Sequence, residues 1–420
     1  MNWVPELAYG VMERCDELAA ITSEPGRIDR YYLTSEHRRC SDLLAHWMKA
    51  AGMTVWEDAA GNLWGRYAAA TDTAPPIRAL IMGSHHDSVP NAGRYDGPLG
   101  ILTALAVVEY LNQKDIRLPF HVDVVAFGDE EGSRFGTTLL GSYPVAGHWQ
   151  PEWWELADRG GVTLEQAFRD FGLDPARIGS CARDPEELLG YLELHIEQGP
   201  VLEHGGHPLG VVTGIAGARR FTVTLEGEVG HAGTVPLALR RDALLGAAEA
   251  ALVVERVARE QDVMATVGRL NAVPGAVNVI AGEACWSLDL RATDDERRDQ
   301  ALRLIRSESN RLCEERGLVS SWRETHSAPA VACATSLHSH QSRALEAMGL
   351  EPVHLPSGAG HDAMAMARIT DVGMFFIRCA GGISHHPDES VMTTDVGLGI
   401  EAMVRTLLNL AQSSANPEGS

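Results

Sequence analysis

Three segments between residues 77 and 128 decide the fold: IRALIMG (77–83), PLGILTALAVVEYLNQ (98–113) and HVDVVAFG (121–128). The first and third are short, apolar and end at glycine, as buried strands do. The middle segment has the length of a helix, and Pro98 stands at a first-turn position that helices tolerate. Strands that alternate with helices predict an α/β fold, with a mostly parallel sheet flanked by helices.

The pattern changes after about residue 211. The segment RFTVTLEGE (220–228) alternates apolar and polar residues, as a half-exposed strand does. The elements predicted after it are a helix, two strands, a helix and a strand, at 242–260, 264–270, 285–292, 295–316 and 318–326. The order β-α-β-β-α-β is typical of a compact α+β module with helices on one face of its sheet.

We therefore predict a catalytic domain made of residues 1–211 and 330–420, interrupted by a smaller domain of residues 212–329. A chain of 420 residues is too long for one ordinary core, so two domains agree with its length. The last residues, SSANPEGS (413–420), predict a frayed tail.

Composition limits the partners and the compartment. The net charge of -22 argues against nucleic acid and against an anionic membrane surface as partners. No apolar run approaches the length of a membrane helix, and acidic residues interrupt the first twenty positions, so no secretory signal is predicted. The 7 cysteines are dispersed and form no C-x-x-C pair. These features predict a cytoplasmic protein with reduced thiols.

Five short segments concentrate His, Asp and Glu beside glycine: GSHHDS (83–88), GRYDGPLG (93–100), GDEEGSRFG (128–136), ELHIEQGP (193–200) and GISHHPDE (382–389). Three of them directly follow a predicted strand or begin a helix. Sites in open α/β sheets form at the carboxyl ends of strands, so these segments are candidates to converge.

The first two segments offer His85, Asp87 and Asp96. On an extended segment His85 and Asp87 share a face, so His85 can bind a cation while Asp87 accepts the proton of its other ring nitrogen. A buried histidine bonded to its neighbouring carboxylate explains the same pair. Asp96 precedes a helix, where a lone Asp is more often an N-cap.

The other segments leave similar alternatives. Glu130 and Glu131 follow an apolar strand, where a carboxylate pair is usually solvated, yet they could serve as one metal ligand and one general base. His195 alternates with apolar residues, as a core histidine does, and a loop histidine such as His385 is more often structural. The combination is harder to explain by structure alone, because all these residues stand beside glycine at the ends of elements.

Imidazole and carboxylate together suit Zn²⁺, Mn²⁺, Co²⁺ or Ni²⁺. Two cations that share one bridging carboxylate need about five protein ligands and leave room for a water molecule, which a further carboxylate can deprotonate. No cysteine stands within these segments, which argues against a structural zinc site.

The motifs GSHHDS, YDGPLG, DEEGSRF, ELHIEQGPVLE, GHAGTVP, PGAVNVI, SGAGHDA and GISHHP resemble, in this order, those of the dinuclear metal amidohydrolases of the aminoacylase/carboxypeptidase type. They are most similar to the ureido-hydrolysing branch, which comprises allantoate amidohydrolases, N-carbamoyl-L-amino acid hydrolases and β-ureidopropionases. The resemblance covers about residues 30 to 410. It implies a catalytic α/β domain interrupted by a dimerisation or lid domain, and a homodimer.

The resemblance also implies the centre itself, with two divalent ions (Zn, Mn, Co or Ni) per subunit. Asp96 would bridge them, Glu130 would be the general base, and Asp87 would orient His85. The five implied metal ligands are His85, Asp96, Glu131, His195 and His385. The patterns G-S-H-x-D and S-H-x-P select His85 and His385 over the adjacent His86 and His386.

Further roles follow from the resemblance. His231 would stabilise the oxyanion, often in the partner subunit's active site, and Asn278 and Arg291 would hold the substrate carboxylate. Gln198 would contact the substrate, and His361 would lie near the pocket. Without the resemblance, a turn histidine, a strand-end amide and an exposed arginine would explain the first three.

The implied reaction is hydrolysis of a small ureido carboxylate, with release of an amine, carbon dioxide and ammonia. The segments IAGARRFTVTLEGE and SGAGHDA favour allantoate slightly over N-carbamoyl-L-amino acids. A dipeptidase or N-acyl-amino acid amidohydrolase on the same scaffold is the alternative, and ELHIEQG argues against it because many such peptidases carry a carboxylate where His195 stands. A metal-binding protein without activity would be expected to lack Glu130 or a ligand, and none is missing.

Overall fold

The computed structural model describes residues 4–71, 73 and 75–415. The chain divides into two compact units: unit 1 extends to Thr213 and resumes at Cys333, and unit 2 is Gly214–Ala332. The sequence placed the changes of domain after residues 211 and 329. The predicted tail lies outside the described residues from position 416 onward, and its first three residues belong to helix α11 (Thr393–Ala415) instead. Among the described residues, no helix is long and apolar enough to cross a membrane.

The larger sheet has the strand order β1-β2-β4-β3-β5-β16-β6-β14, and β15 pairs with β6. Its centre is parallel, because β3 pairs in parallel with β4 and β5, and β5 with β16, whereas the outer pairs are antiparallel. The strands are β1 (Thr54–Glu57), β2 (Leu63–Tyr67), β3 (Ala79–His85), β4 (His121–Phe127), β5 (Leu188–Ile196), β6 (Leu209–Ile215), β14 (Val331–Ala332), β15 (His354–Ser357) and β16 (Val372–Ile377). This confirms the predicted α/β class. The central strands are buried on both faces, which explains their uninterrupted apolar sequences.

Helices α1 (Val4–Ala19), α2 (Ser35–Ala50), α3 (Pro98–Gln113), α9 (Thr335–Ala347) and α11 share one apolar core with the sheet. The bounds of α3 are those that the sequence predicts, and almost every side chain from Pro98 to Val108 is buried. The shorter helices of unit 1 are α4 (Ser142–Val145), α5 (Leu164–Phe171), α6 (Val201–Gly205) and α10 (Ala363–Met366).

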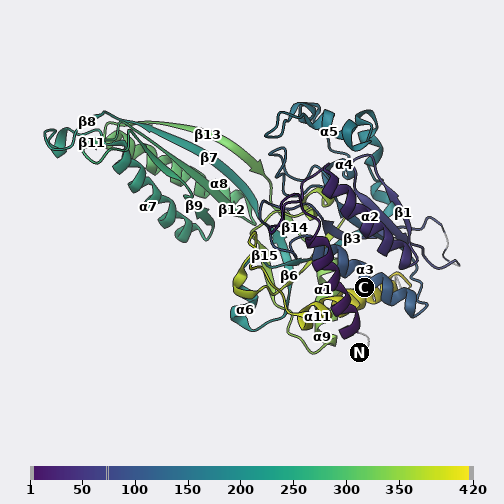
Figure 1. Cartoon of the computed structure of the whole chain (residues 1–420). Helices are drawn as coiled ribbons and strands as arrows, with labels where there is room; N and C mark the ends of the chain where they lie inside the picture. The colour runs from purple at the N-terminus through teal and green to yellow at the C-terminus, as the bar shows by residue number, and fades with distance from the viewer. Residues whose placement is uncertain (1–3, 72, 74, 416–420) are drawn as a thin grey trace. The chain divides into compact units, whose positions relative to one another are not determined.

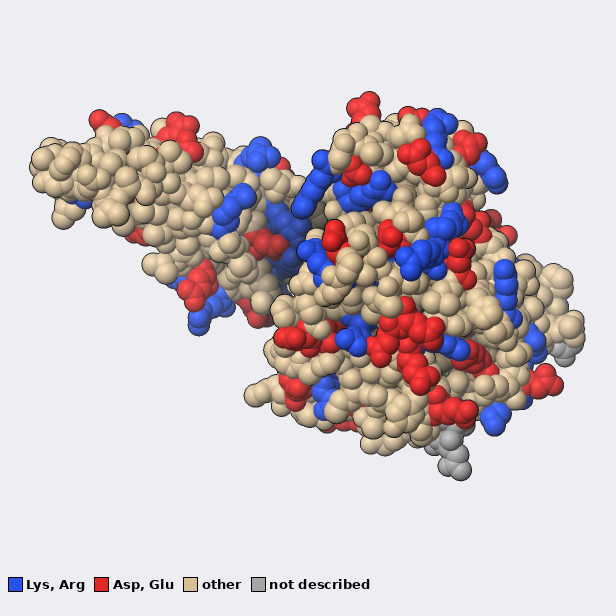
Figure 2. Space-filling model, in the orientation of Figure 1, with Lys and Arg blue, Asp and Glu red and all other residues tan. Residues whose placement is uncertain are grey.

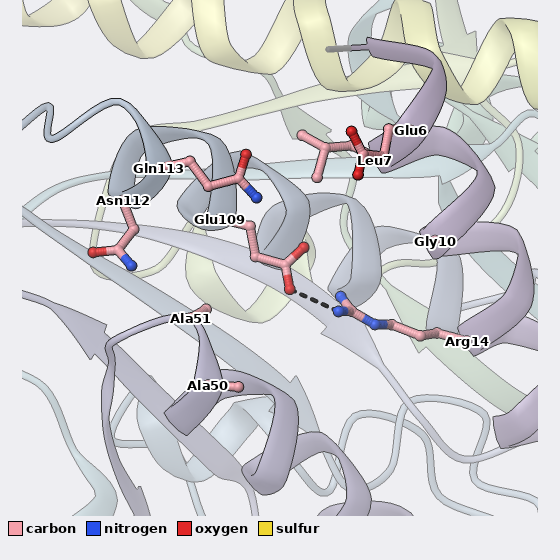
Figure 3. A pocket seen from close by; sticks show the side chains of 9 residues that line it. All are labelled: Glu6, Leu7, Gly10, Arg14, Ala50, Ala51, Glu109, Asn112 and Gln113. Atoms are coloured by element: carbon pink, nitrogen blue, oxygen red, sulfur yellow. Dashed lines mark hydrogen bonds and ion pairs between the residues drawn. The ribbon is translucent and has the colours of Figure 1, made fainter.

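A shallow groove of about 280 Å³ lies between α1, the end of α2 and α3 (Figure 3). An ion pair of 2.7 Å between Arg14 Nη2 and Glu109 Oε1 spans it. None of the predicted site residues lines this groove.

Unit 2 is an antiparallel sheet of strand order β10-β12-β7-β13, with β9 also on β12, and helices α7 and α8 pack against it (Figure 1). The bounds are β7 (Gly217–Glu226), α7 (Ala243–Gln261), β9 (Met264–Thr266), β10 (Leu270–Val273), β12 (Glu283–Ala292), α8 (Asp295–Glu315) and β13 (Val319–Ala328). The single strand predicted at 264–270 is wrong. The chain breaks into β9 and β10 around Gly268, since glycine weakens a strand interior. A two-residue ladder of β8 (Gly230–His231) and β11 (Val279–Ile280) adds to the predicted order.

Candidate metal centre

Most of the predicted ligands lie at one edge of the parallel strands. His85 ends β3, Glu130 and Glu131 follow β4, and His195 is the second-last residue of β5. Two further residues come from loops: Asp96 shortly before α3, and His385 after β16. Because β4, β3, β5 and β16 are neighbours and run in parallel, their carboxyl ends meet at the same edge of the sheet.

Asp96 stands at the middle of this cluster. Its Oδ1 lies 3.1 Å from His195 Nε2 and 3.7 Å from His85 Nε2. Its Oδ2 lies 3.2 Å from His385 Nε2, which is itself 3.4 Å from Glu131 Oε1. The two oxygens of one buried carboxylate therefore face two different sets of donor atoms.

The ring nitrogens of the buried histidines are oriented by their neighbours. His85 Nδ1 lies 3.1 Å from Asp87 Oδ1, and His195 Nδ1 lies 2.9 Å from the carbonyl oxygen of Ile196. When each Nδ1–H donates to its oxygen, the lone pair of each Nε2 points toward Asp96. This is the arrangement that metal-binding histidines use.

Asp87 also orients the two glutamates. Its Oδ1 accepts the backbone N–H of Glu130 at 3.0 Å, and its Oδ2 accepts that of Glu131 at 3.2 Å. One carboxylate thus fixes a histidine from β3 and the chain that leaves β4.

Charge is crowded at this edge of the sheet. Burial alone would raise the pKa of Asp96, but hydrogen bonds with His195, His385 and His85 hold it well below its ordinary value. Burial, followed by the charge of Asp96, raises the pKa of Glu131 to about 7, and the hydrogen bond with Asp96 raises the pKa of His385 to about 9. Burial and the charge of Glu131 raise the pKa of Glu130 well above its ordinary value. The negative charge of so many buried carboxylates must be balanced by protons or by bound cations.

The donor set fits divalent cations. Among the described residues, four groups of three side chains each offer ligand atoms within 4.8 Å of one another: His85–Asp96–His195, Asp96–Glu131–His385, His85–Glu130–Glu131 and Glu193–His195–His361. The first two share Asp96 and together contain all five predicted ligands. Imidazole nitrogen and carboxylate oxygen are the ligands that Zn²⁺, Mn²⁺, Co²⁺ and Ni²⁺ accept.

His86 and His386, the sequence neighbours of the predicted ligands His85 and His385, lie outside the cluster. His86 is buried against His37, with ring centroids 4.6 Å apart, because successive side chains of an extended segment point in opposite directions. His386 is largely exposed, and its Nδ1 accepts the backbone N–H of Asp388.

Gly97 permits the close approach of Asp96 and His85. Its φ is +84°, and a Cβ there would lie 2.4 Å from the carbonyl oxygen of His85 and 2.7 Å from its Nδ1. Any side chain at this position would overlap both the carbonyl oxygen and the imidazole ring of His85.

Gln198 and His361, which the sequence predicts to lie near the substrate, both lie beside predicted metal ligands. Gln198 Nε2 donates to Asp96 Oδ2 at 3.0 Å, and its buried Oε1 has no hydrogen-bond partner among the described residues. His361 is buried beside His195, with ring centroids 4.6 Å apart, and its Nε2 lies 2.7 Å from Ser357 Oγ.

Sequence reasoning missed two buried glutamates that contact this centre. Glu193 Oε1 accepts a hydrogen bond of 2.7 Å from Ser84 Oγ, and Glu389 Oε1 accepts the backbone N–H of Asp96 at 3.1 Å. Both stand inside quoted motifs, ELHIEQGP and GISHHPDE, and that position was the one available signal.

The three predicted residues of unit 2 do not gather in one place. His231 and Asn278 are neighbours, since His231 pairs with Val279 and the N–H of Ala232 donates to the carbonyl oxygen of Asn278. Arg291 stands near the other end of β12, where its Nε and Nη2 donate to the two oxygens of Asp289 at 2.7 and 3.0 Å.

An α/β fold with a largely buried cluster of histidines and carboxylates at the strand ends defines a class of protein with a candidate divalent-metal centre. The chain belongs to peptidase family M20/M25/M40, whose model matches residues 81–409. This is a family of metal-dependent hydrolases, and the chain is a hydrolase that acts on C–N bonds.

Two sequence relatives and one solved structure show how similar the chain is to known proteins. The chain is 40% identical over 402 residues to an N-carbamoyl-L-amino acid amidohydrolase of Geobacillus stearothermophilus, covering 95% of this chain and 98% of the other. It is 40% identical over 418 residues to a probable allantoate deiminase of Oryza sativa subsp. japonica, covering 91% and 84%. A solved amidase of the hydantoinase/carbamoylase family from Burkholderia multivorans superposes with a TM-score of 0.89 at 32% identity, covering 96% and 98%.

Proposed function

We propose that the chain is a metal-dependent amidohydrolase that cleaves the ureido C–N bond of a small carboxylate, allantoate or an N-carbamoyl-L-amino acid, and releases ammonia and carbon dioxide. The observation that carries this proposal is the placement of Asp96, whose two oxygens face two different groups of metal-binding side chains. The relatives named for carbamoyl amino acids and for allantoate support the ureido substrate.

Two divalent ions, Zn, Mn, Co or Ni, would be held by Asp96 and the four residues around it. His85 and His195 would serve one ion, Glu131 and His385 the other, and Asp96 both. When bound, such ions make water acidic and polarise the carbonyl oxygen of the substrate.

Glu130 would carry the proton. Glu130 is the third residue after β4, and its carboxylate lies close to the ligand atoms of His85 and Glu131. It would accept a proton from the attacking water and return it to the leaving nitrogen. Asp87 would keep Glu130 in place, because it accepts the glutamate's backbone N–H.

Arg291 and Asn278 would hold the substrate carboxylate, His231 would stabilise the oxyanion, and Gln198 and His361 would line the pocket. Arg291 suits this role because a guanidinium binds a carboxylate through two parallel hydrogen bonds. Asp289 already fixes the guanidinium through its Nε edge.

The distances within unit 2 favour a homodimer. Eight residue steps of β12 separate Glu283 from Arg291, which is about 26 Å at about 3.3 Å per residue. The ladder of β8, which ends at His231, and β11, which directly follows Asn278, lies beyond the Glu283 end (Figure 1). One copy of unit 2 therefore cannot bring both Arg291 and His231 to one small substrate, and a partner subunit would supply His231.

The surface of unit 2 supports the same proposal. Near β8 and β11, apolar side chains are exposed, with Leu237 at 78% and Val229 and Leu239 also open to solvent. Figure 2 shows few charged side chains at this end of the unit. Exposed apolar side chains that gather in this way mark protein interfaces.

We also propose a cytoplasmic location, since all 7 cysteines are free thiols.

An ammonia-release screen tests the proposed reaction. Metal-stripped protein is loaded with Mn²⁺, Zn²⁺, Co²⁺ or Ni²⁺ and given allantoate, a panel of N-carbamoyl-L-amino acids, dipeptides and N-acyl amino acids. We expect ammonia from at least one ureido compound, and none from the Asp96→Ala variant. Cleavage of dipeptides or N-acyl amino acids, without ammonia from any ureido compound, would contradict the proposal and favour the peptidase alternative.

A further inference from the structure

Glu389 is a buried carboxylate that holds the backbone of the central metal ligand. Its side chain is among the buried polar groups, with 3% of the residue exposed. Its Oε1 accepts the backbone N–H of Tyr95 at 2.8 Å and that of Asp96 at 3.1 Å. We propose that Glu389 is a positioning residue that fixes the bridging carboxylate of Asp96 for cation binding, an inference that rests on the proposed function.

The same glutamate reaches the loop that carries His385. The hydroxyl of Ser384 lies 3.4 Å from Glu389 Oε2 and 3.2 Å from Asp96 Oδ2. His385 itself has a φ of +55°, a conformation that costs energy in a residue other than glycine and persists only where neighbouring contacts hold it. Glu389 thus joins the segment of Asp96 to the segment of His385, which lie almost 300 positions apart in the sequence.

Gly93 shows that space is reserved for this side chain. A Cβ at Gly93 would lie 2.2 Å from Glu389 Cδ and 2.3 Å from its Oε1. Real Cβ atoms do not approach other atoms so closely, so a side chain at position 93 would move Glu389 away from the two backbone N–H groups.

The orientation of Asp96 matters because each of its oxygens faces different donors. A small rotation of the carboxylate would bring Oδ1 away from His195 or Oδ2 away from His385. Glu389 fixes the main chain of Asp96, and Ser384 and Gln198 fix its Oδ2. Groups that orient metal ligands in this way typically change metal affinity by about 10- to 100-fold when they are removed.

The experiment is a calorimetric titration of metal-stripped protein with Mn²⁺ alone, so it needs no substrate. Glu389→Ala should weaken Mn²⁺ binding by about 10- to 100-fold. Glu389→Gln keeps an acceptor oxygen for both N–H groups, so its affinity should lie within about threefold of the wild type. Gly93→Ala should weaken binding in the same direction as Glu389→Ala.

Glu197→Ala is the matched control. Glu197 is also buried, and its carboxylate accepts two backbone N–H groups, those of Val201 at 2.7 Å and Leu202 at 2.9 Å, but these residues are not metal ligands. Both alanine variants should lower the melting temperature of the metal-free protein, and only Glu389→Ala should lose Mn²⁺ affinity.

The outcomes separate this inference from the proposed function. Wild-type affinity in Glu389→Ala, equal losses in Glu197→Ala, or failure of Glu389→Gln to restore binding would each overturn the role of Glu389 and leave the ureido reaction standing. A wild-type protein that binds no Mn²⁺ would overturn both. Mn²⁺ binding with the predicted losses, in a protein inactive on every ureido compound, would refute the proposed reaction alone.

Discussion

Replacing Gly97 by alanine should weaken cation binding through the imidazole of His85. The new Cβ would lie 2.4 Å from the carbonyl oxygen of His85, 2.6 Å from its Cε1 and 2.7 Å from its Nδ1. In the metal-free variant the ring can move aside and relieve its two contacts with the new Cβ, whereas the contact with the carbonyl oxygen persists in both states. Cation binding needs Nε2 in its original place, so the overlap must be restored on binding, at about 1–3 kcal/mol for an overpacked contact.

This energy corresponds to a loss of affinity of about 5- to 150-fold for Mn²⁺, measured by titration of metal-stripped protein. The positive φ of Gly97 adds backbone strain to both states of the alanine variant, which lowers stability but does not alter affinity. Gly161→Ala is the matched control, because Gly161 has a φ of +81° and no atom within 4 Å of its added Cβ. If Gly97→Ala binds Mn²⁺ as the control does, the role of His85 at this centre is wrong.

Three further predictions concern separate parts of the molecule. Burial lowers the pKa of His37 to about 3, so the folded imidazole stays neutral while the unfolded one takes up a proton below about pH 6.5. Between pH 7.5 and pH 5 the wild type should therefore lose about 2 kcal/mol more unfolding free energy in urea than His37→Gln does, and equal losses would show that this histidine titrates normally. Arg291→Lys should raise KM for the ureido substrate about 10- to 100-fold with little change in kcat, whereas a fall in kcat alone would contradict carboxylate binding. Mixed dimers of inactive His231→Ala and Glu130→Gln subunits should recover part of the activity, and verified mixed dimers without recovery would mean that His231 acts within its own chain or not at all.

The sequence predicted the parts of the fold whose pattern is local. The bounds of α3 agree because Pro98 begins it and apolar residues fill it. The strand predicted at 77–83 was ended at its glycine, yet β3 continues to His85 because Gly83 stays in the ladder opposite Val125. A Cβ at Gly83 would lie 1.9 Å from the carbonyl oxygen of Val125, so this glycine permits a close approach and does not end the strand.

The candidate site likewise has features that the local sequence predicts and features that it does not. The segments that carry the ligands could be selected from their glycine-flanked motifs, and strand alternation explains why His86 turns away from His85. The contact of Glu389 with the backbone of Asp96 could not be predicted, because a glutamate near the end of the chain has no periodic relation to a segment 293 positions earlier. Such contacts follow from tertiary packing alone.

Glu130→Gln tests the central claim most directly, because it removes one proton acceptor and keeps the shape of the side chain. With the best ureido substrate of the screen, we expect kcat to fall by about 10²–10⁴-fold, as for loss of a general base, while metal content and substrate affinity stay those of the wild type. A variant that retains most of its ammonia release with unchanged metal content would contradict the account, because hydrolysis at the cluster around Asp96 would then proceed without Glu130.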